Sequence, residues 1–208
     1  MRHGRTAWND EGRFQGTEDV ALDDVGIAQA ERAASMLAVL GPTAIVSSDL
    51  ERARATAAPL AALTGLSVTS DPGLRETYAG VWQGRVRADL ERDHRADLLA
   101  WSKGDEIRPG GGETRTEVAA RMVAAIERAL ISVSTGGTLV VVTHGGAART
   151  AACAMLGLPR STWSSFGVLA NCSWTVLAET GWAAPYPAWR LTEYNAGSLP
   201  VPAVGDDR

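Results

Sequence analysis

Two spacings of apolar residues alternate along the chain and predict an alternation of helices and strands. Repeats of three or four residues, typical of a helix with one buried face, cover residues 24–40, 49–63, 85–101, 115–130 and 147–156. Short apolar runs, typical of buried strands, cover residues 43–47, 66–69 and 138–142. An antiparallel hairpin is predicted over residues 171–178 and 188–194. We expect Trp174, Trp182 and Trp189 to pack beneath it.

Residues with capping preferences mark the ends of these helices. Asp23 or Asp24 begins the first helix, which would end at Gly41-Pro42 and bury Ile27, Ala30, Ala34 and Leu37. The start of the second fits a capping box at Ser48 and Glu51, and the helix after residue 114 fits one at Thr114 and Glu117. The charged helix over residues 85–101 would belong to a cap segment, about residues 77–113, that covers a pocket.

Length and composition favour one domain. The chain has 208 residues, of which 45% are hydrophobic, and this suffices for one well-buried core but not for two. We expect a single domain over residues 1–198 and a disordered, polar tail over residues 199–208. Two cysteines, Cys153 and Cys172, fit neither a zinc site nor a disulfide framework, so we expect buried free thiols.

Charge restricts the partners of the chain. A net charge of −4 excludes a general nucleic-acid or membrane-surface binder, because both require a basic face. No apolar run reaches the ~18 to 20 residues of a membrane span, and no leader precedes the first motif. We therefore expect a cytoplasmic protein that binds small molecules. Arginine must supply any anion binding, because Lys103 is the single lysine.

The first candidate for chemistry is the start of the chain. One turn of chain contains three groups suited to phosphate. Arg2 supplies a guanidinium that can bind it, His3 an imidazole that can attack it, and Gly4 a backbone that can approach it. The alternative is a frayed terminus with a solvated Arg-His pair. Partners for His3 further along the chain decide between the two.

Three later residues could provide those partners. Arg52 lies in the first turn of a predicted helix, where an anion would relieve its conflict with the positive helix end, unless it points into solvent. Glu76 lies in a loop rich in glycine and aromatic residues, as a general acid or as an ion-pair partner of Arg75. His144 ends an apolar strand and opens a helix, where ligands bind in α/β sheets, although a lone histidine is more often a hydrogen-bonded core residue. His94 is expected to be solvated.

Together these segments resemble the histidine phosphatase superfamily, which includes the cofactor-dependent phosphoglycerate mutases. The likeness rests on Arg2-His3-Gly4 with Thr6 and Asn9, Ser48-x-Leu50-x-Arg52-Ala53-x-x-Thr56-Ala57, Leu74-x-Glu76 with Gly80-x-Trp82-x-Gly84, and His144-Gly145-Gly146. Within the superfamily, residues 45–50, 74–77, 171–175 and 189–191 resemble glucosyl-3-phosphoglycerate phosphatases.

The resemblance implies a three-layer α/β sandwich with a mostly parallel central sheet and one antiparallel edge strand. In the family, Arg-His-Gly directly follows a central strand, yet Met1 stands immediately before Arg2. We therefore expect a native start upstream of Met1. Losing about five buried apolar side chains would cost roughly 7 to 15 kcal/mol, which is the whole stability of a typical domain. The chain as written would then fold and act only with difficulty.

The resemblance also implies the role of each site residue. His3 would attack phosphorus, Arg2 and Arg52 would keep it neutral and clamp the phosphoryl group, and His144 would donate a hydrogen bond to it. Glu76 would protonate the leaving group and then activate water. Asn9, Gln15 and Gly145 would add substrate contacts. Arg5, where the family commonly has Glu or Gln, would add positive charge if it faced the pocket.

These roles predict a metal-independent phosphomonoester hydrolase that forms a phosphohistidine on a small metabolite such as glucosyl-3-phosphoglycerate or a phosphoglycerate. The alternatives are a phosphoglycerate mutase and an inactive member that binds phosphate ligands or partner proteins. Two histidines and a glutamate could bind zinc, but the neighbouring arginines would repel it, so we expect no metal and no cofactor. An exposed strand edge would allow a homodimer.

Overall fold

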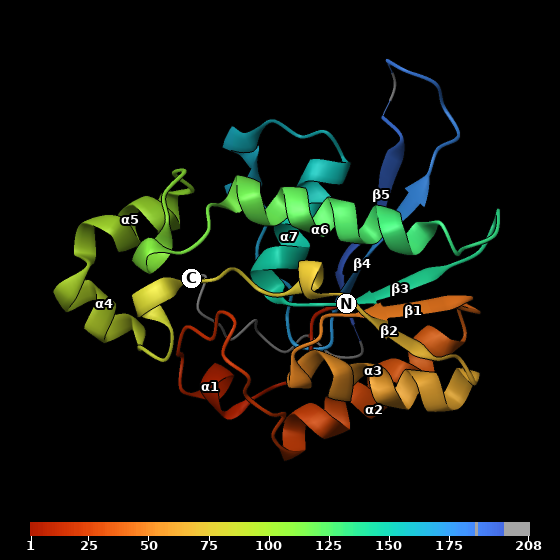
Figure 1. The fold of residues 1–208 in the computed structure, drawn as a ribbon, viewed down its shortest axis with the longest axis horizontal. Coiled ribbons are helices and arrows are strands. Elements are labelled where there is room, and N and C mark those ends of the chain that lie inside the picture. The colour runs from red at the N-terminus through yellow and green to blue at the C-terminus, as the bar shows by residue number, and fades with distance from the viewer. Residues whose placement is uncertain (186, 198–208) are drawn as a thin grey trace.

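Three short parallel strands form the centre of the fold in the computed structural model, which describes residues 1–185 and 187–197 (Figure 1). Strand β1 (Ala44–Ser47) lies between β2 (Val68–Ser70) and β3 (Leu139–Val142), and the crossovers between them are helical, as parallel strands require. The three predicted strands are confirmed, with small shifts at their ends. The predicted tail over residues 199–208 lies outside the described residues.

Residues 1–3 occupy the central position beside β3. The His3 amide donates to the Thr143 carbonyl and the Thr143 amide to the Met1 carbonyl, which makes a parallel bridge. On the opposite side, the Arg2 amide donates to the Ser173 carbonyl, directly before the antiparallel pair β4 (Trp174–Glu179) and β5 (Trp189–Ala196). The predicted α/β class, with a mostly parallel sheet and an antiparallel edge, is confirmed.

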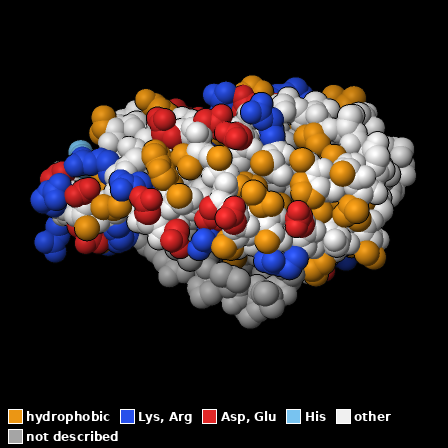
Figure 2. Space-filling model, turned by 90° about the horizontal axis from the view of Figure 1, so that it is seen from below, with side chains coloured by type: hydrophobic (Ala, Val, Ile, Leu, Met, Phe, Trp, Pro, Cys, Tyr) orange, Lys and Arg blue, Asp and Glu red, His pale blue; other side chains and the backbone are white. Residues whose placement is uncertain are grey.

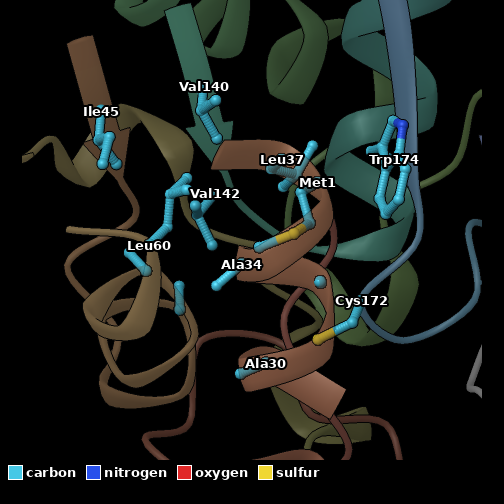
Figure 3. Close-up of a cluster of buried hydrophobic side chains, with 13 residues drawn as sticks. Met1, Ala30, Ala34, Leu37, Ile45, Leu60, Val140, Val142, Cys172 and Trp174 are labelled. Atoms are coloured by element: carbon cyan, nitrogen blue, oxygen red, sulfur yellow. The ribbon is translucent and has the colours of Figure 1, made fainter. Parts of the chain in front are cut away.

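Helices cover both faces of the central sheet, which gives three layers (Figure 1). Helices α2 (Asp24–Ala38) and α3 (Glu51–Thr64) pack on one face, and α6 (Arg115–Leu130) and α7 (Gly145–Met155) pack on the other. Because side chains alternate along a strand, Ile45 joins the first core and Val46 the second. Figure 3 shows the first core, in which Met1 and Cys172 lie among side chains of the sheet and of α2 and α3.

A separate group of elements, formed largely by residues of the predicted cap segment, stands beside the sandwich. Helices α4 (Arg87–Asp93) and α5 (Arg95–Lys103) enclose a small core with Phe14 and Trp82. Figure 2 shows charged side chains of both signs gathered at this end of the molecule. The single helix predicted over residues 85–101 is wrong: it breaks at His94, whose ring nitrogen lies 3.2 Å from an Arg85 nitrogen. His94 is accordingly only partly exposed.

Several local predictions are corrected by tertiary contacts. Ile27 and Trp182 are 48% and 50% exposed instead of buried. Helix α3 has Leu50 as its N-cap, so Ser48 does not cap it, and the Asp19 carboxylate from a distant loop binds the Glu51 amide instead. The capping box at Thr114 and Glu117 is confirmed. The helix at residues 7–10, α1 (Ala7–Asp10), was not predicted.

Two further features bear on function. The glycines of residues 110–112 pack within the cap segment: a Cβ on Gly112 would lie 1.7 Å from the Tyr78 carbonyl oxygen. In the described part of the chain, none of the helices combines the length and the apolar character needed to cross a membrane.

Candidate active site

Four chain segments meet at the carboxyl ends of the parallel strands. His3 follows the segment beside β3, and His144 follows β3 itself and is the N-cap of α7. Arg52 lies in the first turn of α3, after β1, and Glu76 lies in the loop after β2. All four side chains are buried. The sheet therefore brings the four predicted residues to the edge where ligands bind in α/β folds.

His3 is held in one tautomer by its own chain. Its Nδ1 lies 2.7 Å from the Gly4 carbonyl oxygen, and Nδ1 must carry the proton because a carbonyl only accepts. Burial, and then the charges of Arg52 and Arg2, hold the pKa of His3 well below 6.5, although the bond to Gly4 opposes them. The ring is therefore neutral at neutral pH, with a lone pair on Nε2.

The Arg52 side chain points its Nε–H between the two histidines. This nitrogen lies 3.3 Å from His3 Nε2 and 3.2 Å from His144 Nδ1. Its Nη nitrogens donate to the carbonyl oxygens of Gly16 and Glu18, at 2.8 and 2.6 Å. These carbonyls fix the orientation of the guanidinium but, being uncharged, leave it cationic.

His144 accepts at one nitrogen and donates at the other. Because Nδ1 faces the Arg52 donor, Nε2 carries the proton and donates to Ser48 Oγ at 2.9 Å. Burial, and then the Arg52 charge, lower the pKa of His144 well below 6.5. The two neutral imidazole rings thus meet edge to face, with their centroids 5.1 Å apart.

Arg2 adds positive charge beside the start of α7. Its Nη1 donates to the Leu169 carbonyl at 2.7 Å. A Cβ on Gly145 would lie 3.3 Å from the Arg2 side chain and 2.4 Å from Val168, so close packing requires glycine there. Gly145 is the first residue of α7, and its amide is one of those that no helix carbonyl accepts. Both features favour an anion next to His3.

The Glu76 carboxylate binds the first turn of α7. One oxygen accepts from the Gly146 amide at 3.0 Å, and the other accepts from the Ala147 and Thr77 amides at 2.9 and 2.8 Å. Gly146 and Ala147 follow His144, the N-cap of the same helix, by two and three residues. These bonds therefore hold the carboxylate near His144. Glu76 is therefore anchored by backbone donors at the site.

The ion pair considered between Glu76 and Arg75 is not formed. Arg75 pairs with Asp49 instead, at 2.5 Å, and this bond is the main reason that the pKa of Asp49 is lowered. Arg121 of α6 donates to the main-chain carbonyls of Arg75 and Glu76, at 2.6 and 2.8 Å, and to the Glu113 carboxylate. Arg121 thereby fixes the loop that carries Glu76.

The expected substrate-binding residues have different surroundings. Asn9 and Gln15 are buried, and their side-chain oxygens lie 3.2 and 3.0 Å from Thr6 Oγ1, whose single proton can go to one of them at a time. Arg5, by contrast, is bound by the carboxylates of Asp10 and Asp23, at 2.9 and 2.8 Å. Its charge is therefore offset by two carboxylates, and its role as a substrate-binding residue stays a prediction.

A pocket adjoins Glu76 on the side of the cap segment. Its wall is mainly apolar, with two aromatic rings, and is formed by Phe14, Gly16, Glu76, Thr77, Ala79, Trp101 and Pro109. Gly16, which is part of this wall, also accepts a hydrogen bond from Arg52 through its carbonyl oxygen.

Sequence reasoning left two supporting residues without a role. Thr56 accepts from the Gly4 amide at 2.9 Å and donates to the Arg52 carbonyl, so it ties the His3 turn to α3. Thr56 lies four residues after Arg52, which places both side chains on one helix face. This spacing is the feature of the sequence that could have indicated its role. Ser48 fits a helix cap by sequence, and nothing local reveals its bond to His144.

Phosphoryl transfer needs a nucleophile, positive charge around the non-bridging oxygens and a proton for the leaving group. Together with the three-layer sheet, this geometry defines the class of phosphatases that act through histidine. The chain belongs to the histidine phosphatase superfamily (branch 1), whose family model matches residues 1–192.

Known relatives agree with that class. The chain is 39% identical to the glucosyl-3-phosphoglycerate phosphatase of Mycobacterium tuberculosis, over 95% of this chain and 93% of the relative. It is 36% identical to a probable phosphoglycerate mutase, GpmB, of Yersinia pestis, over 83% and 80%. The solved structure of mycobacterial glucosyl-3-phosphoglycerate phosphatase with VO3 matches with a TM-score of 0.88 at 39% identity, over 94% of this chain and 96% of that one. The predicted superfamily, fold and enzyme class, a phosphatase, are confirmed.

Proposed function

We propose that the chain hydrolyses a small phosphomonoester in two steps, through a phosphohistidine on His3 Nε2. The observation that carries the proposal is the His3 tautomer: Nδ1 is committed to the Gly4 carbonyl, so the lone pair lies on the nitrogen that faces Arg52. A neutral imidazole is the form that can attack phosphorus.

In the first step, His3 Nε2 forms a bond to phosphorus while the bond from phosphorus to the ester oxygen breaks. The Nε–H of Arg52 turns from the imidazoles to a non-bridging oxygen, which frees the lone pair. His144 donates from Nδ1 in its other tautomer, with Nε2 accepting from Ser48, because a hydroxyl can donate as well as accept. Glu76 gives its proton to the leaving alkoxide.

In the second step, water attacks phosphorus and the bond to Nε2 breaks. The Glu76 carboxylate takes the proton from the attacking water and is thereby restored for the next cycle. Inorganic phosphate leaves, and His3 returns to its neutral form. The positive charges of Arg2 and Arg52 stabilise the equatorial oxygens in both steps.

The substrate that we propose is glucosyl-3-phosphoglycerate or a related phosphorylated glycerate. The relatives of that name support it. The phosphate would bind between the two histidines and the glucosyl part would extend toward the cap segment.

A phosphoglycerate mutase is the second candidate. The observation in its favour is the 36% identity to a probable mutase. Its first half-reaction would be the same, but the phosphohistidine would return its phosphoryl group to a glycerate hydroxyl instead of to water. Product analysis separates the two, because only hydrolysis yields inorganic phosphate.

The deciding experiment measures inorganic phosphate release in the presence of a chelator, from glucosyl-3-phosphoglycerate and from 3-phosphoglycerate. We compare the wild-type chain with His3→Ala and with His94→Ala, a matched variant in the cap segment. We expect release by the wild type and by His94→Ala, and a loss of at least about 1,000-fold in His3→Ala.

An unchanged rate in His3→Ala would exclude covalent catalysis by this residue. A folded wild type that interconverts phosphoglycerates without release would identify a mutase. If a chelator abolished the activity and added metal restored it, metal independence would be overturned. Among the described residues, no group of three or more His, Cys, Asp and Glu side chains is arranged to hold a metal ion. A cytoplasmic location, a single domain with a cap over residues 77–113 and a homodimer stay predictions.

A further inference from the structure

The turn before β4 lies against the nucleophile segment. The Cys172 amide lies 3.2 Å from the carbonyl oxygens of both Arg2 and His3, and the Arg2 amide donates to the Ser173 carbonyl at 2.9 Å. Cys172 adopts φ of +54°, a left-handed conformation that is uncommon for a residue other than glycine. The turn is therefore held in one conformation, with Asn171 directly before its tightest point.

The Asn171 side chain connects two residues of the site. Its Nδ2 lies 3.1 Å from the His3 carbonyl oxygen and 3.1 Å from Asn9 Oδ1, so it donates to both. These partners are more than 160 residues away in sequence. One amide group thus links the main chain of the nucleophile to the side chain of Asn9.

These contacts fix which way the Asn9 amide faces. Asn9 Oδ1 accepts from the Asn171 side-chain amide at 3.1 Å and from the Thr6 main-chain amide at 3.2 Å. The reversed amide would place its NH2 group against the Thr6 and Asn171 N–H donors, which cannot accept. The orientation of Asn9 is therefore set by its partners.

The Asn9 NH2 group is left available by this arrangement. Asn9 is 1% exposed, and within the described part of the chain its Nδ2 has no hydrogen-bond partner. A buried donor without an acceptor is costly and uncommon in folded proteins. An anionic oxygen bound next to His3 would satisfy it.

We propose that Asn171 is a positioning residue for phosphoryl transfer, which acts by holding the Asn9 amide with its NH2 group toward the phosphoryl oxygens. The inference rests on the proposed function, because it needs a phosphoryl group at His3. Asn171 itself does not touch the substrate. Its contribution is to select one of two orientations of Asn9.

Two substitutions at Asn171 test the polarity of this contact. Asn171→Ala removes the donor that orients Asn9, so part of the molecules lose the hydrogen bond from Asn9 to the phosphoryl group. We expect kcat to fall on the order of 10- to 100-fold while KM changes little. Asn171→Asp keeps the shape but offers only acceptors, so it should reverse the Asn9 amide and lower kcat further than alanine does.

A double variant tests whether Asn171 acts through Asn9. We expect Asn9→Ala and the double variant Asn9→Ala/Asn171→Ala to have the same kcat within about twofold, because the second change has nothing left to orient. Asn195→Gly is the matched control: Asn195 has a left-handed φ of +53° and its side chain accepts from the Ala170 amide in the same turn. It should lower the melting temperature and leave kcat unchanged.

Either of two results would overturn the inference: a wild-type kcat in Asn171→Ala, or losses that multiply in the double variant. Circular dichroism confirms that each variant is folded. If the wild type itself releases no phosphate, the proposed function fails. If the wild type is active and His3→Ala is not, unchanged Asn171 variants reject only the role of Asn171.

Discussion

His3 and His144 are buried next to two arginines, and this environment determines their charge. Protonation of either ring would place a further positive charge beside Arg52, out of contact with water. This repulsion lowers the pKa of each ring. As a result, His3 needs no deprotonation to act as a nucleophile at neutral pH. The same features that prepare the site for a phosphate dianion therefore make it sensitive to acid.

The lowered pKa values predict a pH-dependent stability. Below about pH 6.5 the unfolded chain takes up protons at both positions and the folded chain does not, so the free energy of unfolding falls as the pH falls. Burial also lowers the pKa of the Met1 ammonium to about 5, so this group adds to the loss in the same direction. For the three groups together we expect a loss of about 3 kcal/mol between pH 6.5 and 5.5. Urea denaturation at both values measures it, and His144→Gln should remove about a third of the dependence. Equal stability at both values would contradict the neutral pair.

Glu76 can be tested through the leaving group. Glu76→Gln keeps an acceptor for the α7 amides but has no proton to give, so hydrolysis of an alkyl phosphate should fall by about 100- to 10,000-fold. With p-nitrophenyl phosphate, whose leaving group needs no proton, phosphorylation of His3 should remain fast. Rapid mixing should then detect a burst of nitrophenol followed by slow turnover. Equal losses with both substrates would argue against a general acid.

At the scale of elements, the site is assembled where the nucleophile turn packs against the start of α2. A Cβ on Gly4 would lie 2.5 Å from the Gly26 carbonyl oxygen, and a Cβ on Gly26 would lie 2.0 Å from the Arg5 carbonyl oxygen. Two glycines thus let the two backbones touch. Thr56 of α3 fixes the same turn from the other side through the Gly4 amide.

This contact predicts that Gly4→Ala displaces His3. The added methyl group must push backbone against backbone, which should cost about 1 to 3 kcal/mol of stability and most of the activity. Gly157→Ala is the matched control, because Gly157 has φ of +66° and open space around it. Its cost of about 1 to 2 kcal/mol comes from conformation alone. Thermal melts and phosphate release should therefore show similar destabilisation but loss of activity only in Gly4→Ala.

At the scale of the whole molecule, the central sheet separates two cores. Leu60 of α3 belongs to the core on one face, and Met122 of α6 belongs to the core on the other. Both side chains are almost completely buried. The site lies at the strand ends between the two cores, so either core can be weakened without direct contact with the histidines.

The separation predicts additive effects on stability. Leu60→Ala and Met122→Ala should each lower the free energy of unfolding by about 2 to 5 kcal/mol. In the double variant the losses should add to within about 0.5 kcal/mol, because the residues belong to different cores on opposite faces of the sheet. Chemical denaturation of the four proteins measures this. A sum that fails by more than 1 kcal/mol would mean that the two cores are coupled.

The elements that follow local rules could be predicted from the sequence. The strand over residues 139–142 is an apolar run, and α6 begins at a capping box, so neighbouring residues decide each of them. The four central residues of the site could be found through the resemblance of their short motifs to those of the family, because local sequence left each of them a second interpretation.

Orientation within the site was decided by the tertiary structure alone. Ser48 bonds to His144, and Asn171 bonds to His3 and Asn9, across most of the length of the chain. Arg5 is neutralised by Asp10 and Asp23, although its neighbours in sequence gave no sign of it. The sequence by itself determined which chemistry the chain carries. Only folding decided which atom of each group faces the substrate, because hydrogen bonds depend on partners that local sequence cannot bring together.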